Sequence, residues 1–255
     1  MLKRLLDFTY DAYVDFIRLL KMKYRIVPFC QAEEAEAPFL ILRHDVDASL
    51  RAALKMAKME KKLGVKSTYF VLFSHKLYNL LEKDSMAALR EISMLGHEIG
   101  LHYDVGTYEG YGQDLRETLQ NEAQMLEHIL GGKIHSVACH NVSLMTGQDP
   151  FREFKDYINV YDPRFCKSYV SDSCRAWFLK DLQSLLGFKF KEVQLLIHPF
   201  LWTEDACQRD EVLIGLFQDA QIKNEKYKLE WLRAWHESPK VKKYEKAILK
   251  EMRRR

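Results

Sequence analysis

The sequence predicts an α/β fold in which a parallel sheet is covered by helices. Seven short apolar segments have the length of strands, and longer helical or polar segments separate them. Three of the long segments stop immediately before a glycine, the residue favoured just after a helix end. A parallel neighbour can be reached only through a crossover of a dozen or more residues, so this alternation indicates parallel pairing with right-handed crossovers.

The strands and helices can be placed along the chain in order. The expected strands are Phe39–Arg43, Thr68–Phe73, Glu98–His102, Ile134–Cys139, Tyr157–Tyr161, Ser168–Ser171 and Val193–Ile197. The clearest crossover helices are Ala48–Leu63, Lys83–Leu95 and Gln113–Leu130, which stop at Gly64, Gly96 and Gly131. The first of these helices is rich in Ala, Leu, Lys and Met, which are good helix formers.

A single α/β domain with additions at both ends is expected from the length of 255 residues. Residues 1–37 are predicted to form an N-terminal helical extension that contains an amphipathic aromatic helix at Tyr10–Leu20. Residues 38–204 hold the strands. Residues 205–255 are predicted to form two or three charged helices, and both extensions are expected to pack on the central domain.

Composition excludes several classes of protein. The apolar fraction of 47% and charged fraction of 29% are typical of a globular protein, and no apolar run is long enough for an integral membrane segment. The first residues lack the features of a signal peptide, so a cytoplasmic location is expected. A net charge of +3 is too small to indicate nucleic acid binding, and five cysteines without a CxxC pair argue against a disulfide framework. The oligomeric state is not predicted.

Carboxylates follow the first predicted strand in a pattern that indicates a site. Asp45 and Asp47 alternate with His44 and Val46, so the two carboxylates share one face of the extended chain. Two like charges on one face repel unless a cation lies between them or one of them binds a proton. A metal site at the strand end is the simplest interpretation.

The same rule sorts the histidines, because ligands of parallel α/β sheets bind at the carboxyl ends of the strands. His102 ends its strand, whereas His97 precedes that strand and is expected to cap or pack there. His140 and His198 also follow strands, and His135 does not. His102, His140 and His198 are therefore the candidate site histidines.

Each candidate also has a purely structural interpretation. Asp45 and Asp47 precede a predicted helix and could cap its N-terminus. A buried histidine can serve only as a hydrogen-bonding core residue. Trp177 and Trp202 could form a sugar-facing wall, but aromatic residues more often belong to a core.

Four motifs in residues 38–202 resemble the polysaccharide deacetylase family, carbohydrate esterases of the NodB-like type, and in particular its Asp-x-Asp branch. The motifs are Asp45-Val46-Asp47, the GHEIGLH segment at 96–102, Asp172 with Trp177, and Leu196-Ile197-His198-Pro199. Their order along the chain is that of the family.

The resemblance implies a distorted (β/α) barrel of about seven strands, with helical N- and C-terminal additions. It also implies a divalent metal, commonly Zn²⁺, that helps to remove an acetyl group from an N-acetylated sugar. Asp45 would then be the general base, Asp47 and His102 metal ligands, and His198 the general acid. Asp172 would orient His198 or cap a turn.

One departure from the family pattern concerns the third metal ligand. The family's second motif has a further His at the position that Gly106 occupies here. His140 or Asp104 would have to supply the third ligand, and His140 is favoured because imidazole is the commoner zinc ligand. Asn141, Trp177 and Trp202 are the expected substrate contacts.

The sequence thus predicts a metal-dependent hydrolase that removes an N-acetyl or other acyl group from a sugar or sugar conjugate, with surface-polysaccharide synthesis as one possible setting. Two alternatives stay open at this stage. One is a hydrolase of another non-peptide C–N bond. The other is a catalytically weak or inactive deacetylase-like module that binds carbohydrate, which the glycine at position 106 would favour.

Overall fold

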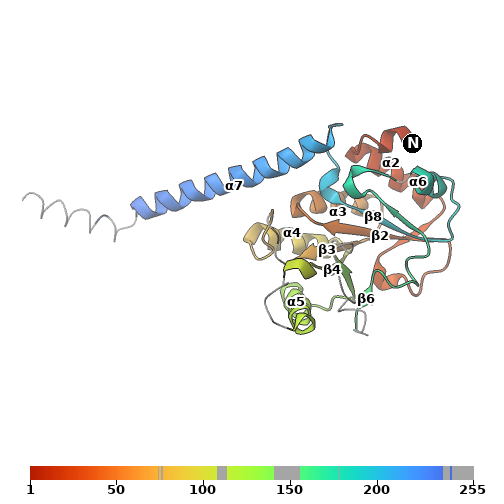
Figure 1. Cartoon of the computed structure of the whole chain (residues 1–255), viewed down its shortest axis with the longest axis horizontal. Helices are drawn as coiled ribbons and strands as arrows, with labels where there is room; N and C mark the ends of the chain where they lie inside the picture. Colours follow the sequence, from red (N-terminus) through yellow and green to blue (C-terminus); the bar gives the residue numbers. More distant parts are fainter. Residues whose placement is uncertain are drawn as a thin grey trace, which may run out of the picture. The chain divides into compact units, whose positions relative to one another are not determined.

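A computed structural model describes residues 1–73, 75, 77–107, 114–140, 156–177, 179–237 and 242 (Figure 1). The chain divides into two compact units, Met1–Val212 and Leu213–Arg255. The helices are α1 (Leu2–Leu5), α2 (Tyr10–Lys21), α3 (Leu50–Lys62), α4 (Lys83–Met94), α5 (Leu115–Leu130), α6 (Leu179–Leu186) and α7 (Arg209–Glu237). The strands are β1 (Arg25–Val27), β2 (Phe39–Val46), β3 (Thr68–Leu72), β4 (Glu98–Tyr103), β5 (Ser136–Cys139), β6 (Ile158–Asn159), β7 (Tyr169–Ser171) and β8 (Glu192–Ile197).

The first unit is an α/β fold built on a parallel sheet with the strand order β6-β5-β4-β3-β2-β8-β7. Every pairing in this order is parallel, and the sheet curls into a distorted (β/α) barrel that is open between β6 and β7 in the described part of the chain. The predicted fold class and all seven predicted strands are confirmed, with ends that differ by up to three residues.

Strand β1 is an element that the sequence interpretation missed. It lies within residues 1–37, where only helices were expected, and it pairs with the first half of β2 at Phe39–Ile41. The second half of β2, Arg43–Val46, pairs with β3 instead. The short β1 therefore gives hydrogen-bond partners to the part of β2 that β3 does not reach.

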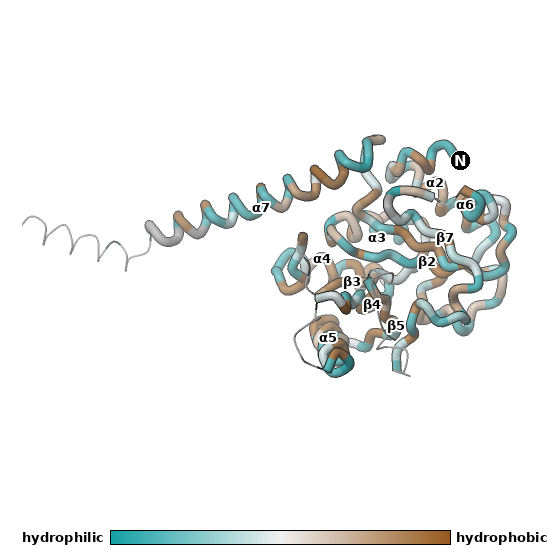
Figure 2. The backbone as a smooth tube through the Cα atoms, in the orientation of Figure 1, coloured by the Kyte–Doolittle hydropathy of each residue, from teal (hydrophilic) through white to brown (hydrophobic). Residues whose placement is uncertain are grey.

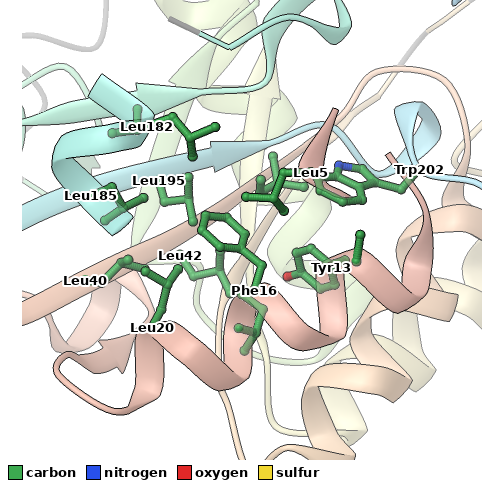
Figure 3. Close-up of a cluster of buried hydrophobic side chains, with 14 of the residues drawn as sticks. Leu5, Tyr13, Phe16, Leu20, Leu40, Leu42, Leu182, Leu185, Leu195 and Trp202 are labelled. Carbon is green, nitrogen blue, oxygen red and sulfur yellow. The ribbon is translucent and has the colours of Figure 1, made fainter. Parts of the chain in front are cut away.

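The N-terminal helices cover one face of this sheet (Figure 3). Their buried side chains meet those of β2, β8 and α6, and the main members of the cluster are Leu5, Tyr13, Phe16, Leu20, Leu40, Leu42, Leu182, Leu185, Leu195 and Trp202. Each such side chain contributes about 1.5–3 kcal/mol when it leaves water. The N-terminal extension is consequently part of the core of the first unit.

Helix α7 differs from the strands in its hydropathy. The strands at the centre of the first unit are largely hydrophobic, whereas hydrophilic and hydrophobic residues are mixed along α7 (Figure 2). Two or three helices were predicted after residue 205, but the described residues form one helix of 29 residues. That these residues pack on the barrel stays a prediction. No helix in the described ranges has the length and apolar character needed to cross a bilayer.

A buried polar cluster lies behind β2, on the face opposite the barrel interior. The Glu60 carboxylate accepts hydrogen bonds from Ser67 Oγ at 2.5 Å and Tyr69 Oη at 3.0 Å, and from the Tyr13 hydroxyl. His44 Nε2 lies 2.7 Å from the same carboxylate. Burial alone would raise the pKa of Glu60, but His44 beside it lowers the pKa to about 2. Glu60 thus joins α2, α3, β2 and β3.

His97, which sequence analysis excluded from the site, also belongs to this cluster. Its Nε2 lies 3.0 Å from the Ala57 carbonyl oxygen, and its Nδ1 is 3.6 Å from the Glu60 carboxylate. The imidazole is buried. The expectation that His97 packs near the entry of its strand is confirmed.

Glycine is required at position 100, where β4 faces the barrel interior. A Cβ atom there would lie 2.8 Å from the Ser136 carbonyl oxygen and inside the contact distance of the Phe70 ring. Phe70 is the register partner of Gly100 on β3. The close approach of this ring to the β4 backbone therefore depends on a residue without a side chain.

We expect Gly100→Ala to lower the free energy of unfolding by about 1–3 kcal/mol, because the added methyl overpacks the interior. Urea denaturation followed by circular dichroism measures this change. Gly132→Ala is the matched control, because a Cβ at Gly132 has no neighbour within 4 Å. Equal stability of the two variants would show that Phe70 moves aside at no cost.

We expect Glu60→Gln to lower the free energy of unfolding at pH 7 by about 3 kcal/mol, because it leaves buried donors without their charged acceptor. The folded-state pKa of Glu60 lies below its ordinary value of 4.5, so its contribution is complete above that pH and is lost as the pH falls toward about 2. The free energy of unfolding, obtained from urea denaturation at several pH values in this interval, should depend less on pH for the variant than for the wild type. Glu91→Gln, at the partly exposed Glu91–Lys58 ion pair, is the control that should leave stability nearly unchanged.

Candidate metal centre

The candidate residues come together at the carboxyl ends of the strands. Asp47 follows β2, His102 is on β4, His140 follows β5 and His198 follows β8. By register, Leu72 of β3 pairs with His102, and His102 pairs with Ala138 of β5. Strands two apart are about 10 Å from each other across a flat sheet. The curl of the sheet is therefore what brings side chains from β2 and β4 into contact.

Three ligand atoms converge at these strand ends. Asp47 Oδ1 lies 3.3 Å from His102 Nε2 and 3.5 Å from His140 Nδ1, and the two imidazole nitrogens are 3.3 Å apart. Asp47, His102 and His140 form one cluster whose ligand atoms all lie within 4.8 Å of one another. We call these three residues the ligand triad.

The hydrogen bonds around the triad leave its inner atoms available. His102 Nδ1 lies 2.8 Å from the Ala138 carbonyl oxygen, to which it can only donate, so Nε2 carries the lone pair in the neutral ring. Asp47 Oδ1 is buried without a hydrogen-bond donor in the described part of the chain. Burial alone would raise the pKa of Asp47, but His102 and His140 lower it well below the usual range. The carboxylate is therefore charged.

The spacing of the triad fits a small divalent cation. Ligands bound tetrahedrally at about 2.1 Å from a zinc ion lie about 3.4 Å from one another. The three separations in the triad, 3.3, 3.5 and 3.3 Å, lie close to that value. Two nitrogens and a carboxylate oxygen also match the donor preference of Zn²⁺.

Asp45 lies beside the triad and is held by Arg43. Arg43 Nε donates to Asp45 Oδ1 and Nη2 donates to Oδ2, each at 2.7 Å, and both side chains are buried. His102 Nε2 is 3.6 Å from Asp45 Oδ2. Burial would raise the pKa of Asp45, but the guanidinium lowers it, so Asp45 is a carboxylate with a fixed orientation.

His198 lies on the other side of the triad and is held by Asp172. His198 Nδ1 is 2.6 Å from Asp172 Oδ1, and its Nε2 is 3.7 Å from Asp47 Oδ2. Trp202 Nε1 donates to the other Asp172 oxygen at 2.8 Å. Burial would lower the pKa of His198, but the bond to Asp172 raises it to about 9. Nε2 of His198 therefore carries a proton toward the triad at neutral pH.

A cavity of about 490 Å³ opens over these groups. Its walls are formed by the ligand triad, Asp45 and His198, together with Tyr161, Tyr169, Ser173, Leu196, Cys139 and Cys166. This volume lies in the range of pockets for small-molecule ligands. The mixture of aromatic, apolar and charged walls suits a ligand that has both polar and apolar faces.

Several predicted residues lie elsewhere. Trp177 and Trp202 are buried in the core with 7% and 1% of their surface exposed, and neither lines the cavity. The expected sugar-facing wall of these two residues is therefore wrong; Trp202 orients Asp172, and Trp177 Nε1 bonds to the Leu5 carbonyl. Asp104 accepts from the Gly106 N–H in a turn and is outside the triad. Asn141 lies outside the described residues.

Neither Asp45 nor Asp47 caps helix α3, the structural role that the sequence left open for them. Ser49 is the N-cap of α3, and its hydroxyl accepts from the Ala52 N–H at 3.2 Å. Asp45 and Asp47 instead point to the cavity that they line. Both carboxylates are thus free of the capping role.

Sequence reasoning missed two kinds of neighbour. Arg43 precedes Asp45 by two residues and therefore shares its face, a signal that was present in the alternation of β2. His75 follows β3, and its ring lies 6.4 Å from that of His140. Its position three residues beyond Leu72 concealed it, because a loop residue has no fixed face.

No family model and no curated protein matches the sequence. Among solved structures, the fold is similar to that of a CE4 family pseudoenzyme from Bacillus anthracis, with 16% identity and a TM-score of 0.46 over 77% of this chain and 65% of the other. It is also similar to a mutant peptidoglycan deacetylase from Bacillus subtilis (16%, TM-score 0.44, 78% of this chain and 98% of the other). A third is the chitin deacetylase of Colletotrichum lindemuthianum (14%, 0.43, 76% and 86%). The present chain spans slightly less than two thirds of the pseudoenzyme.

We expect His140→Ala to lose zinc, whereas His75→Ala keeps it, because only His140 contributes to the triad. Elemental mass spectrometry of the purified proteins, after incubation with zinc and desalting, measures the difference. His75 is a fair control because it is a half-buried imidazole at the same edge of the sheet. Retention of zinc by His140→Ala together with its loss from Asp104→Ala would transfer the ligand role to Asp104.

Proposed function

We propose that the protein is a metal-dependent hydrolase that removes an N-acetyl or related acyl group from a sugar or sugar conjugate. The observation that carries this proposal is the ligand triad, whose three ligand atoms have the mutual spacing of a tetrahedral zinc site. Three protein ligands with an open fourth position are typical of catalytic rather than structural zinc sites. The cavity above the triad provides that open side.

Asp47, His102 and His140 would hold the ion. When bound, the ion supplies Lewis acidity, which acidifies water and polarises an amide carbonyl. Zn²⁺ is the proposed metal because the donors are two imidazoles and one carboxylate.

Asp45 and His198 have opposite protonation states, as acid–base catalysis of amide hydrolysis requires. Asp45 is a carboxylate beside the triad and is proposed to accept the proton of the attacking water. His198 is protonated at neutral pH and is proposed to donate its Nε2 proton to the departing amine. Because the Asp172 bond fixes Nδ1, the proton that His198 can give is at the atom that faces the cavity.

That the acyl group is attached to a sugar is proposed from the residues that line the cavity. Tyr161, Tyr169 and Leu196 offer apolar contacts beside charged groups, and sugars present an apolar ring face with polar edges. Hydrolysis of another non-peptide C–N bond would use the same groups and is distinguished by the substrates tested. The cytoplasmic location expected from the N-terminal sequence stays a prediction.

We expect Asp45→Asn to lower the turnover of an N-acetyl sugar by about 10²–10⁴-fold, because the amide cannot take the proton. Zinc content should change little, because Asp45 is not a triad member. Released acetate, measured with chitooligosaccharides and N-acetylglucosamine conjugates, reports turnover.

Asp104→Asn is the control, because this carboxylate also follows a strand of the sheet but accepts a hydrogen bond within a turn. Circular dichroism must show that Asp45→Asn is folded, since the exchange leaves the buried Arg43 charge without its partner. A folded Asp45→Asn protein with wild-type turnover would refute the base assignment. A wild-type protein that binds zinc and sugar without releasing acetate would favour the non-catalytic binding module.

A further inference from the structure

Arg43 has an unusual environment for a charged side chain. Its exposed fraction is 0%, and it is the one arginine buried to this degree among the described residues. It stands on β2 two residues before Asp45, so its side chain enters the barrel interior on the same face as the candidate site. A buried guanidinium is costly unless its N–H groups are bonded, which makes its partners informative.

The guanidinium uses four of its five N–H donors. Two bond to Asp45, Nη1 donates to Gln194 Oε1 at 3.1 Å, and Nη2 also donates to Tyr161 Oη at 3.0 Å. The guanidinium carbon lies 5.5 Å from the centre of the Phe70 ring and 5.1 Å from that of Tyr161. Hydrogen bonds therefore fix the orientation of the group, and two aromatic rings lie close to it.

Tyr161 continues these contacts to the third metal ligand. Its hydroxyl accepts from Arg43 and donates to the Cys139 carbonyl oxygen at 2.8 Å, so both of its main hydrogen-bonding roles are used. Cys139 is the last residue of β5 and directly precedes His140. The His140 N–H in turn donates to the Tyr103 carbonyl oxygen at 2.7 Å. The peptide before His140 is thus held from two sides.

We propose that Arg43 and Tyr161 form a brace that positions Asp45 and His140 relative to each other. The brace consists of the Arg43–Asp45 pair, the Arg43–Tyr161 bond and the bond from Tyr161 to the Cys139 carbonyl. Arg43 and Tyr161 are positioning residues, since they act through Asp45 and His140, the groups proposed to contact the substrate and the ion. The assignment rests on the proposed function, because it concerns the same site.

The brace gives His140, which follows β5, a position as well defined as that of His102 on β4. His102 is fixed within its strand by the bond from Nδ1 to the Ala138 carbonyl. His140 comes after the last residue of β5, and its backbone is held to β4 by the single bond from its N–H to the Tyr103 carbonyl. The hydroxyl of Tyr161 supplies a second constraint on the same peptide, at the Cys139 carbonyl oxygen.

The experiment compares the zinc affinity of Tyr161→Phe with those of the wild type and Tyr69→Phe, by competition with a chelating indicator. Tyr69 is the matched control because it is also a buried tyrosine with a bonded hydroxyl, but its bond goes to Glu60 behind the sheet. We expect about tenfold or more weaker zinc binding for Tyr161→Phe, and binding within twofold of the wild type for Tyr69→Phe. The absence of substrate from this assay separates the brace from any contact that Tyr161 makes as a cavity wall.

A second measurement tests the Arg43 end of the brace. Arg43→Lys keeps the charge but loses the planar fork, and we expect its turnover number to fall about 10–100-fold with little change in KM. In ¹H–¹⁵N spectra, the wild type should show an arginine Nε–H signal that is protected from exchange, is absent from Arg43→Lys and shifts in Tyr161→Phe. It should be unchanged in Tyr69→Phe.

The outcomes separate the two proposals. If the wild type binds zinc and Tyr161→Phe binds it as tightly as Tyr69→Phe, the brace is refuted and the function is untouched. If the wild type binds no zinc, the proposed function fails, and the arginine signal alone decides whether Arg43 is held as described. A wild type without a protected signal that disappears in Arg43→Lys would overturn the brace in either case.

Discussion

The structure depends on the burial of β2 on both faces while three consecutive polar residues, Arg43, His44 and Asp45, lie within it. A buried polar group without a partner costs several kcal/mol, so every one of these side chains requires a specific neighbour. Arg43 and Asp45 satisfy each other inside the barrel, and His44 finds Glu60 on the opposite face. The neighbouring elements are arranged around these requirements.

The two faces of β2 therefore have separate roles. Behind the sheet, Glu60 gathers hydroxyl donors from α2 and β3 and connects the N-terminal extension to the core. Inside the barrel, Arg43 connects β2 with Gln194 of β8 and with Tyr161 after β6. One strand thus couples the stability of the fold to the geometry of the cavity, because a change in its position moves both sets of contacts.

Much of this arrangement was predictable from the sequence. Alternating strands and helices indicated the parallel sheet, and the position of His102 and His140 at strand ends placed them correctly with Asp47. Trp177 and Trp202 were misplaced because the N-terminal extension covers them, and packing between segments such as Leu5 and Trp177, 172 residues apart, leaves no local pattern. β1 was missed because three residues are too few to show a period. The other partners of Arg43, Gln194 and Tyr161, were not predictable, since they lie 151 and 118 residues further along the chain.

The origin of the third ligand on β5 has a consequence for cooperativity. Asp47, His102 and His140 belong to three different strands, and β3, which contributes none of the triad, lies between the first two. An ion bound to all three would hold together the four strands from β2 to β5. Strand β5 is the neighbour of β6, the strand at the open edge of the barrel. Metal binding and the stability of that edge would then be linked, because release of the ion would free β5, the strand on which β6 depends for its pairing.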